Sequence, residues 1–197
     1  AGECVSCGLA EQAWWWRWCA APQIGPRCPA AAPRSANTNC AGREGRSDRP
    51  PLSVDVGAEF LRPVLQAHGR ALFVVVDCLR LDQWAMIRPI IAELFDVETA
   101  HYFSILPTAT PFARNAIFSG LLPAEIKQRY PRWWSEEDEP SMNAHELELL
   151  QEQLRELTGS AVPVRYEKVS STHDGEALLR RLPSQLSQPG VTALVFN

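Results

Sequence analysis

The feature that most constrains the fold is a short, continuous apolar run over residues 71–76, ALFVVV. Its three consecutive valines are β-branched and no polar residue alternates with them, which is typical of a strand buried on both faces in a parallel sheet. The run ends on Asp77. Ligands of open α/β sheets bind beyond the carboxyl ends of the strands, so Asp77 is a candidate for metal or phosphate chemistry.

A second strand is predicted over residues 100–105, and it leads into the turn PTATP at residues 107–111 and a helix that starts near Pro111. A hydroxyl group at a helix N-terminus is well placed to attack a phosphoryl group, because the helix dipole and the free N–H groups attract the anion. Thr108 and Thr110 are separated by one residue, so only one of them should face such a site. Each could also be an ordinary turn or cap threonine.

Strands and helices alternate along the rest of the chain, which predicts an α/β fold with a mostly parallel sheet flanked by helices. The helix predicted over residues 81–95 connects the strands at 71–76 and 100–105, so these should be parallel neighbours joined by a right-handed crossover. Its Trp84, Ile87, Ile91 and Leu94 are spaced to face the sheet. Further helices are predicted at 55–67, 113–121, 124–129, 143–157 and 174–182, and further strands at 162–169 and 191–197.

Residues 1–50 differ in composition from the remainder of the chain. They hold five of the six cysteines and four of the seven tryptophans, and no helical or strand period is sustained. Cys4 and Cys7 could begin a zinc ribbon, although a second CxxC is missing, and the cysteines could also form disulfides. We favour a disordered or non-native leader, so that the folded part begins near residue 51.

The composition of the 197 residues sets broad limits on function. With 46% hydrophobic residues the chain can form one domain with a core. It contains no run of about 18 apolar residues and no signal-peptide pattern, so we expect no membrane-spanning helix and a cytoplasmic location. A formal net charge of −4 argues against stable nucleic-acid binding, but it leaves a nucleotide substrate open. The acidic run at residues 136–139 is interpreted as a solvated loop.

Other residues near the two strand ends are weaker candidates. Arg114 and Asn115 fall in the first turn of the helix after PTATP and could donate hydrogen bonds to phosphate oxygens, although packing or solvent roles are equally open. Cys78 is expected to be a small buried residue, because neighbouring strand residues point to opposite faces. The histidines show no metal-ligand spacing to one another: His68, His101, His145 and His173.

Two long stretches carry a resemblance to a known family. VVVDCLRLDQW at residues 74–84 and SILPTATPFARNAIFSGLLPAEI at residues 104–126 resemble the beginning of the PglZ domain, a branch of the alkaline phosphatase superfamily. The resemblance covers roughly residues 52–197 and is densest over residues 74–135. It is closest to the PglZ domains linked to a response-regulator receiver, as in the PorX-like regulators of type IX secretion.

The resemblance implies a zinc-dependent phosphatase or phosphodiesterase, with two zinc ions in the complete domain and a phosphoester or nucleotide substrate. It makes Asp77 a metal ligand. Thr110, with Phe112 and Asn115 after it, matches the nucleophile pattern of related phosphodiesterases better than Thr108, so Thr110 is the expected nucleophile and second ligand. Zinc coordination would lower the pKa of its hydroxyl group and make an alkoxide available. Arg114 and Asn115 are the expected substrate-binding residues.

The family's two-metal site also requires aspartates and histidines from later strands, which are expected after the strand at residues 192–197. We therefore expect the N-terminal part of the domain, with too few zinc ligands for activity alone and with residues 192–196 as an exposed apolar edge. The receiver domain through which PorX-like regulators could dimerise is not recognisable in residues 1–50. The alternative function is a non-catalytic signalling or interaction module that regulates secretion or transcription.

Overall fold

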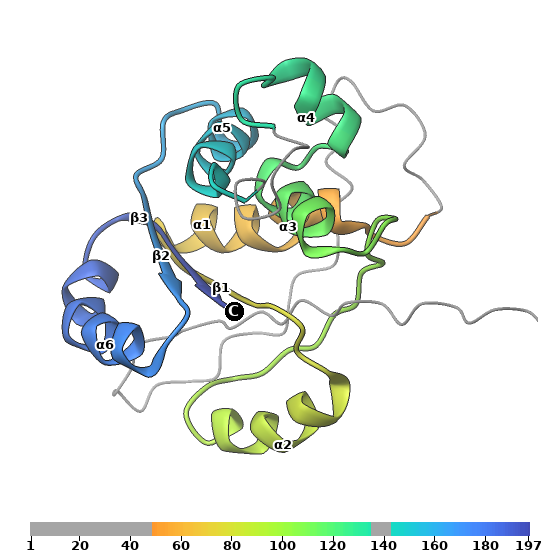
Figure 1. Cartoon of the computed structure of the whole chain (residues 1–197). Helices are drawn as coiled ribbons and strands as arrows, with labels where there is room; N and C mark the ends of the chain where they lie inside the picture. Colours follow the sequence, from red (N-terminus) through yellow and green to blue (C-terminus); the bar gives the residue numbers. More distant parts are fainter. Residues whose placement is uncertain (1–48, 135–142) are drawn as a thin grey trace, which may run out of the picture.

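The computed structural model describes residues 49–134 and 143–197, so the predictions for residues 1–48 and for the acidic run at 136–139 lie outside the described residues. Within them the chain forms a three-stranded parallel sheet with helices on both faces, which confirms the predicted fold class (Figure 1). In chain order the elements are η1 (Ser53–Asp55), η2 (Gly57–Leu61), α1 (Arg62–His68), β1 (Arg70–Val76), α2 (Leu81–Ala92), α3 (Thr110–Ser119), α4 (Pro123–Arg129), α5 (Glu146–Thr158), β2 (Val164–Val169), α6 (Thr172–Leu186) and β3 (Gly190–Phe196).

The three strands end at the same edge of the sheet. Their order is β1-β3-β2, and Val76 of β1 and Val169 of β2 both pair with Phe196 of β3. One residue further on, the Asp77 amide donates to the Phe196 carbonyl at 2.9 Å and the Asn197 amide donates to the Val169 carbonyl at 3.1 Å. Asp77 and Asn197 therefore lie side by side just after the strand ends, at the carboxyl edge where ligands of parallel sheets bind.

The position of β3 corrects one prediction. Residues 191–195 are buried between the two other strands, so the prediction of an exposed apolar edge at 192–196 is wrong. β1 lies at an edge of the sheet, and residues 71–76 pack on both faces, with Phe73 buried on one and Val74 partly buried on the other, except for Val76, which is 43% exposed. Both segments are apolar, and the apolar pattern alone does not determine which of them occupies the centre of the sheet.

Residues 100–105 do not form a strand of this sheet, contrary to the prediction. Phe103 makes one isolated parallel bridge with Leu52, in which its amide donates to the Pro51 carbonyl at 2.8 Å. The predicted crossover between 71–76 and 100–105 is therefore wrong, and α6 is the helix that connects two neighbouring strands, β2 and β3.

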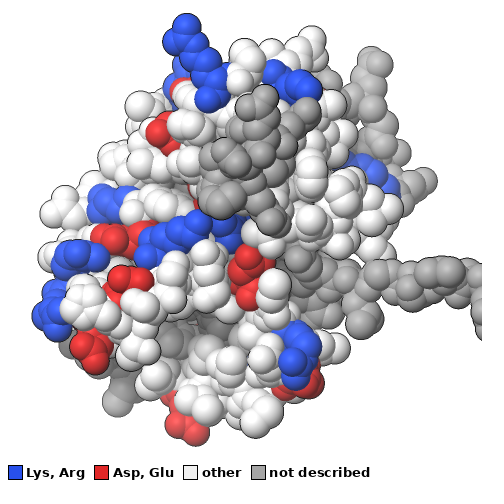
Figure 2. All heavy atoms as spheres, viewed as in Figure 1, with Lys and Arg blue, Asp and Glu red and all other residues white. Residues whose placement is uncertain are grey.

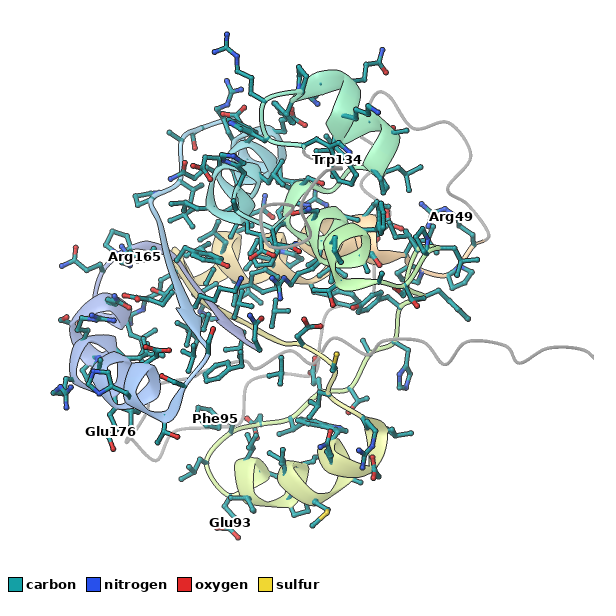
Figure 3. All side chains as sticks on the ribbon, viewed as in Figure 1. Arg49, Glu93, Phe95, Trp134, Arg165 and Glu176 are labelled. Carbon is teal, nitrogen blue, oxygen red and sulfur yellow. The ribbon has the colours of Figure 1, made fainter. Side chains whose placement is uncertain are left out.

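The apolar stripe predicted on α2 does not face the sheet either. Trp84 is buried, but Leu94 is 77% exposed and Ile87 is also exposed. In Figure 1 this helix lies away from the sheet. Glu93 and Phe95, labelled in Figure 3, follow its C-terminal end. Because residues 100–105 add no strand to this sheet, the sheet surface predicted beneath the helix is not formed by the described residues.

The core lies on the face of the sheet that α1, α3 and α5 cover. Phe118 of α3 is fully buried there, with its ring 5.5 Å from Phe73 of β1 and 6.0 Å from Tyr166 of β2. On the opposite face α6 places Leu178 against Leu194 of β3. Alternate strand residues thus point into two layers, as expected for a sheet with helices on both faces.

The segment before α1 contacts the loop that leads into α3. Ser53 Oγ accepts from the Ile105 amide at 3.1 Å, and Arg49, labelled in Figure 3, donates to the buried Asp55 carboxylate at 2.6 Å. Burial of Asp55 is compensated by this ion pair and by the Leu52 amide at 3.0 Å. The loop before α3 is consequently held at two points, at Ile105 by Ser53 and at Phe103 by the bridge to Leu52.

The surface of the described residues carries charges of both signs. On the face in Figure 2, basic and acidic side chains are interspersed, and no single sign covers it. Among the described helices, none is both long and apolar enough to cross a membrane.

Candidate active site

Asp77 is held at the carboxyl edge by a sharp turn directly after β1. The next residue, Cys78, has a positive φ of 56°, and its amide donates to Asp77 Oδ1 at 3.0 Å. A non-glycine residue in this left-handed region turns the chain away from the sheet and leaves the aspartate side chain at the strand end. The Asp77 side chain is 19% exposed, so solvent reaches the carboxylate from one side only. Cys78 itself is exposed, and the expectation that it is buried is wrong.

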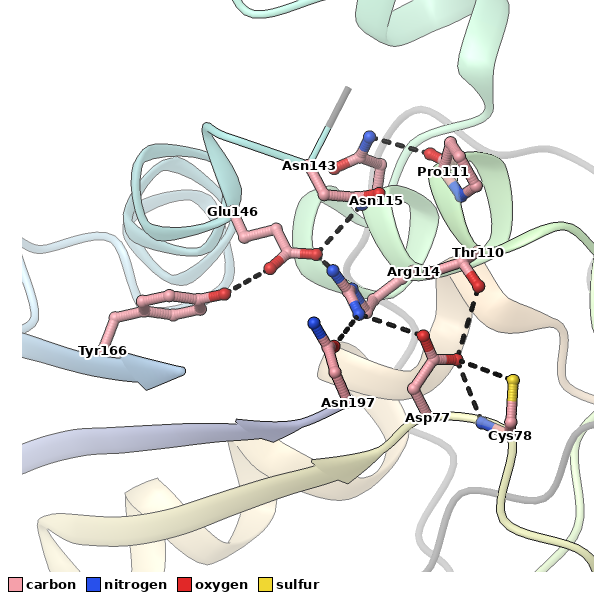
Figure 4. Close-up of polar contacts among 10 residues, drawn as sticks. All are labelled: Asp77, Cys78, Thr110, Pro111, Arg114, Asn115, Asn143, Glu146, Tyr166 and Asn197. Atoms are coloured by element: carbon pink, nitrogen blue, oxygen red, sulfur yellow. Dashed lines mark hydrogen bonds and ion pairs between the residues drawn. The ribbon is translucent and has the colours of Figure 1, made fainter. Parts of the chain in front are cut away.

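Thr110 is the first residue of α3, and its side chain faces Asp77 (Figure 4). Its Oγ1 donates to Asp77 Oδ1 at 3.5 Å. The N-cap position is occupied by Ala109 with extended backbone, and no side chain caps this helix end. The hydroxyl group of Thr110 is therefore not used to cap its own helix. Thr108 is exposed in the preceding turn. The predicted proximity of Asp77 and Thr110 is confirmed.

Arg114 lies one helical turn after Thr110 and places its guanidinium group between two carboxylates. Its NH1 donates to Asp77 Oδ2 at 3.1 Å and to Asn197 Oδ1 at 2.8 Å, while its Nε donates to Glu146 (Figure 4). The side chain is only 6% exposed. Both oxygens of Asp77 thus have a hydrogen-bond donor from α3, one from each of two residues on the same helix face.

Glu146, the first residue of α5, is the innermost charge of the cluster. It is 1% exposed and accepts from Arg114 Nε, from the Tyr166 hydroxyl group and from Asn143 Nδ2, the last at 3.0 Å. Buried charges require a partner of opposite charge and hydrogen bonds to their remaining lone pairs, and Glu146 has both. Burial, and next the charge of Glu146, raise the pKa of Tyr166 far above its ordinary value, so its hydroxyl group remains a donor.

A comparison of the sequence with known families identifies the family of this chain. The sequence model of the BREX system PglZ alkaline phosphatase-like domain matches residues 58–197. This chain belongs to the PglZ family. The matched range contains Asp77, Thr110, Arg114 and Glu146, so the whole cluster lies within the PglZ domain. No curated protein matches the chain. The family description names BREX systems, and the PorX-like branch stays a prediction.

The two residues expected to bind substrate are both inside the PglZ domain. Asn115 is fully buried, and its Nδ2 donates to the Pro111 carbonyl at 2.8 Å. Arg114 is buried and engaged as described above. Neither is turned toward solvent in this structure, and their contact with substrate stays a prediction.

The donors at the edge fit part of a zinc site. Asp77 Oδ1 and Thr110 Oγ1 are oxygen atoms of types that zinc accepts, but catalytic zinc normally takes three protein ligands. Across residues 49–134 and 143–197, no group of three or more His, Cys, Asp or Glu side chains is arranged to hold a metal ion. Asp77 and Thr110 thus bring two oxygen atoms together, fewer than the three protein ligands that catalytic zinc normally takes.

Four members of the cluster were missed by sequence reasoning: Asn143, Glu146, Tyr166 and Asn197. Glu146 stands in the first turn of a helix, where an acidic residue is favoured by the dipole without any other role. Tyr166 lies within an ordinary half-buried strand. Asn197 could have been found, because it follows the apolar strand 191–196 just as Asp77 follows 71–76.

Proposed function

We propose that Asp77 and Thr110 form the reactive part of a zinc-dependent phosphatase or phosphodiesterase site in this PglZ domain. The observation that carries the proposal is the 3.5 Å separation of Thr110 Oγ1 and Asp77 Oδ1, at the carboxyl edge of a parallel sheet and the N-terminus of a helix. Helix N-termini and strand ends of this kind favour anionic ligands such as a phosphoryl group. Membership of an alkaline phosphatase-like family directs the proposal to phosphoesters.

In the proposed reaction Thr110 is the nucleophile. Its Oγ1 forms a bond to phosphorus, the ester P–O bond breaks with its electron pair on the leaving oxygen, and the hydroxyl proton passes to solvent. The product is a phosphothreonine, which attack by water at phosphorus then hydrolyses to restore the hydroxyl group. The positive end of α3 would stabilise the charge on the phosphoryl group.

Zinc, when bound, would lower the pKa of the Thr110 hydroxyl group and offset the charge of the phosphoryl oxygens. Asp77 would hold the ion through a carboxylate oxygen, and Thr110 would hold it through Oγ1. Binding of the ion in this way would break the hydrogen bond between Thr110 and Asp77. The loss of this hydrogen bond costs little, because its length of 3.5 Å is at the limit for hydrogen bonds. Two ions per complete domain are part of this proposal.

The proposed branch within the PglZ family rests on the two sequence stretches at residues 74–84 and 104–126. They support a place in the response-regulator-linked branch and in two-component signalling. A nucleotide-type substrate, a cytoplasmic location and dimerisation through a receiver domain follow from that branch.

The test is hydrolysis of a chromogenic phosphodiester with added zinc, by this chain and by a longer chain that carries the later aspartate and histidine of the family pattern. We expect activity in the longer chain and its loss in Thr110→Ala. The matched control is Thr108→Ala, two residues earlier in the same turn, which should keep the activity. Full activity of Thr110→Ala would remove Thr110 as the nucleophile.

A second candidate function is favoured by the surface of α2. Met86 and Ile90 of this helix, and Leu94 just after its end, are each more than half exposed. Exposed apolar side chains on one helix are typical of an interaction surface, so we also propose a non-catalytic signalling or interaction module. Absence of hydrolysis in both chains, together with no zinc binding, would favour it over the phosphoesterase.

A further inference from the structure

We propose that Glu146 is a positioning residue, which holds the guanidinium group of Arg114 and through it fixes the Asp77 carboxylate at the edge of the sheet. The inference rests on the proposed function only for the role of Asp77 in binding the cation. The chain of contacts from Glu146 to Asp77 is given by the geometry of the side chains (Figure 4).

The guanidinium group connects an inner and an outer carboxylate. Arg114 donates inward to Glu146 through Nε and outward to Asp77 through NH1. Because the guanidinium group is planar and rigid, fixing Nε also fixes the direction of NH1. The exposed fraction rises outward, from 1% at Glu146 through 6% at Arg114 to 19% at Asp77. Glu146 is therefore the anchor, and Asp77 is the end that a ligand can reach.

The anchor is itself held by elements that do not touch Asp77. The Tyr166 hydroxyl group reaches Glu146 from β2, and Asn143 reaches it from the segment before α5. Every partner of the Glu146 carboxylate is thus a donor, and together they join α3, α5 and β2. The same NH1 also binds Asn197 at the end of β3, which ties the strand next to Asp77 into the network.

A role in stability alone does not account for this arrangement. An apolar cluster of similar volume commonly stabilises a core as well as a buried ion pair does, because the pair must first be desolvated. What the ion pair adds is direction: a hydrogen bond from Arg114 that orients the Asp77 carboxylate. Substitution of a residue that lies behind a metal ligand and orients it commonly lowers metal affinity by about 10-fold or more.

The substitution Glu146→Gln tests the proposal. Glutamine keeps the size of the side chain, but its NH2 group must face one of the three donors that surround it. Arg114 then loses its fixed position and Asp77 becomes mobile. The matched control is Glu167→Gln on β2, whose partner Arg181 is an exposed residue of α6 on the other face of the sheet.

The readout is hydrogen exchange of two neighbouring backbone amides, followed by NMR in the full chain. The Cys78 amide donates to Asp77 Oδ1, whereas the Asp77 amide donates to the Phe196 carbonyl within the sheet ladder. In Glu146→Gln we expect exchange of the Cys78 amide to accelerate about 10-fold, the factor that corresponds to loss of a hydrogen bond worth about 1.4 kcal/mol, while exchange of the Asp77 amide is unchanged. Unchanged exchange at Cys78, or equal acceleration at both amides, would overturn the proposal. Tyr166→Phe should act in the same direction if Glu146→Gln does not fold.

Calorimetric titration of the longer chain with zinc separates this inference from the proposed function. We expect the zinc affinity of that chain to fall about 10-fold in Glu146→Gln, as for other residues behind a metal ligand, and to be unchanged in Glu167→Gln. A longer chain of wild-type sequence that binds no zinc would count against the proposed function, while exchange at Cys78 would still decide whether Glu146 positions Asp77. Normal zinc affinity in Glu146→Gln would contradict the positioning role.

Discussion

Thr110 Oγ1 lies 3.5 Å from Asp77 Oδ1, although the two residues are 33 positions apart in the chain. The contact joins the first residue of α3 to the residue directly after β1. It exists because α3 packs on the sheet through Phe118, whose ring lies against Phe73 of β1. The geometry of the reactive edge therefore depends on the packing of the core beneath it.

Phe118→Ala should strongly destabilise the fold. Phe118 is fully buried between Phe73 and Tyr166, and its truncation leaves a cavity under α3, which we expect to cost about 3–5 kcal/mol of unfolding free energy. Chemical denaturation would measure it. Leu179→Ala, at a position 68% exposed on α6, is the control and should change stability by about 0.5 kcal/mol or less. Equal effects of the two substitutions would contradict the described core.

Two glycines form a matched pair that tests the start of β3. Gly159 has a φ of +74° with open space around its Cα, so Gly159→Ala should cost about 1–2 kcal/mol for the left-handed backbone alone. Gly190 has a φ of +102°, and an added Cβ would overlap the Pro163 carbonyl oxygen. Gly190→Ala should therefore cost distinctly more in thermal or chemical unfolding. The reverse order would indicate a different path of the chain into the central strand.

Tyr166→Phe should destabilise the protein in a manner that depends on pH. Removal of the hydroxyl group takes one donor from the buried Glu146, at an expected cost of about 1–3 kcal/mol at neutral pH. Burial and the charge of Glu146 raise the pKa of Tyr166 in the folded state. Above about pH 10, the ordinary value of tyrosine, the unfolded chain loses this proton first and wild-type stability falls as pH rises.

The stability difference between wild type and Tyr166→Phe should consequently narrow as the pH rises from about 10 to about 12. Denaturation curves recorded across this range would measure the difference directly. A constant difference would mean that the Tyr166 hydroxyl group is not held by Glu146.

The sequence was sufficient for the fold class and for the two residues at the edge. The apolar run 71–76 followed by Asp77 and the PTATP turn followed by a helix are local patterns, and each was found where it was predicted. The order of the strands was not predictable in this way. Strand order depends on which helices cover which faces, and β1 and β3 are both largely apolar in sequence.

The buried part of the cluster was not predictable for a related reason. Glu146 is an unremarkable first-turn acid until α5 packs on α3 and brings it to Arg114. Residues 100–105 alternate poorly, and their one bridge to Leu52 depends on the N-terminal segment that passes beside them. Both features arise from contacts between distant segments, and neither has a local signature.

Anomalous diffraction at the zinc absorption edge, from crystals of this chain grown with zinc, would show whether Asp77 and Thr110 hold the ion. We expect an anomalous peak at about 2 Å from an Asp77 carboxylate oxygen and from Thr110 Oγ1, the usual length of a zinc–oxygen bond. Asp77→Asn should remove the peak, and Asp82→Asn, an exposed aspartate on α2, should not. Zinc bound only elsewhere, with the hydrogen bond between Thr110 and Asp77 still in place, would contradict the account.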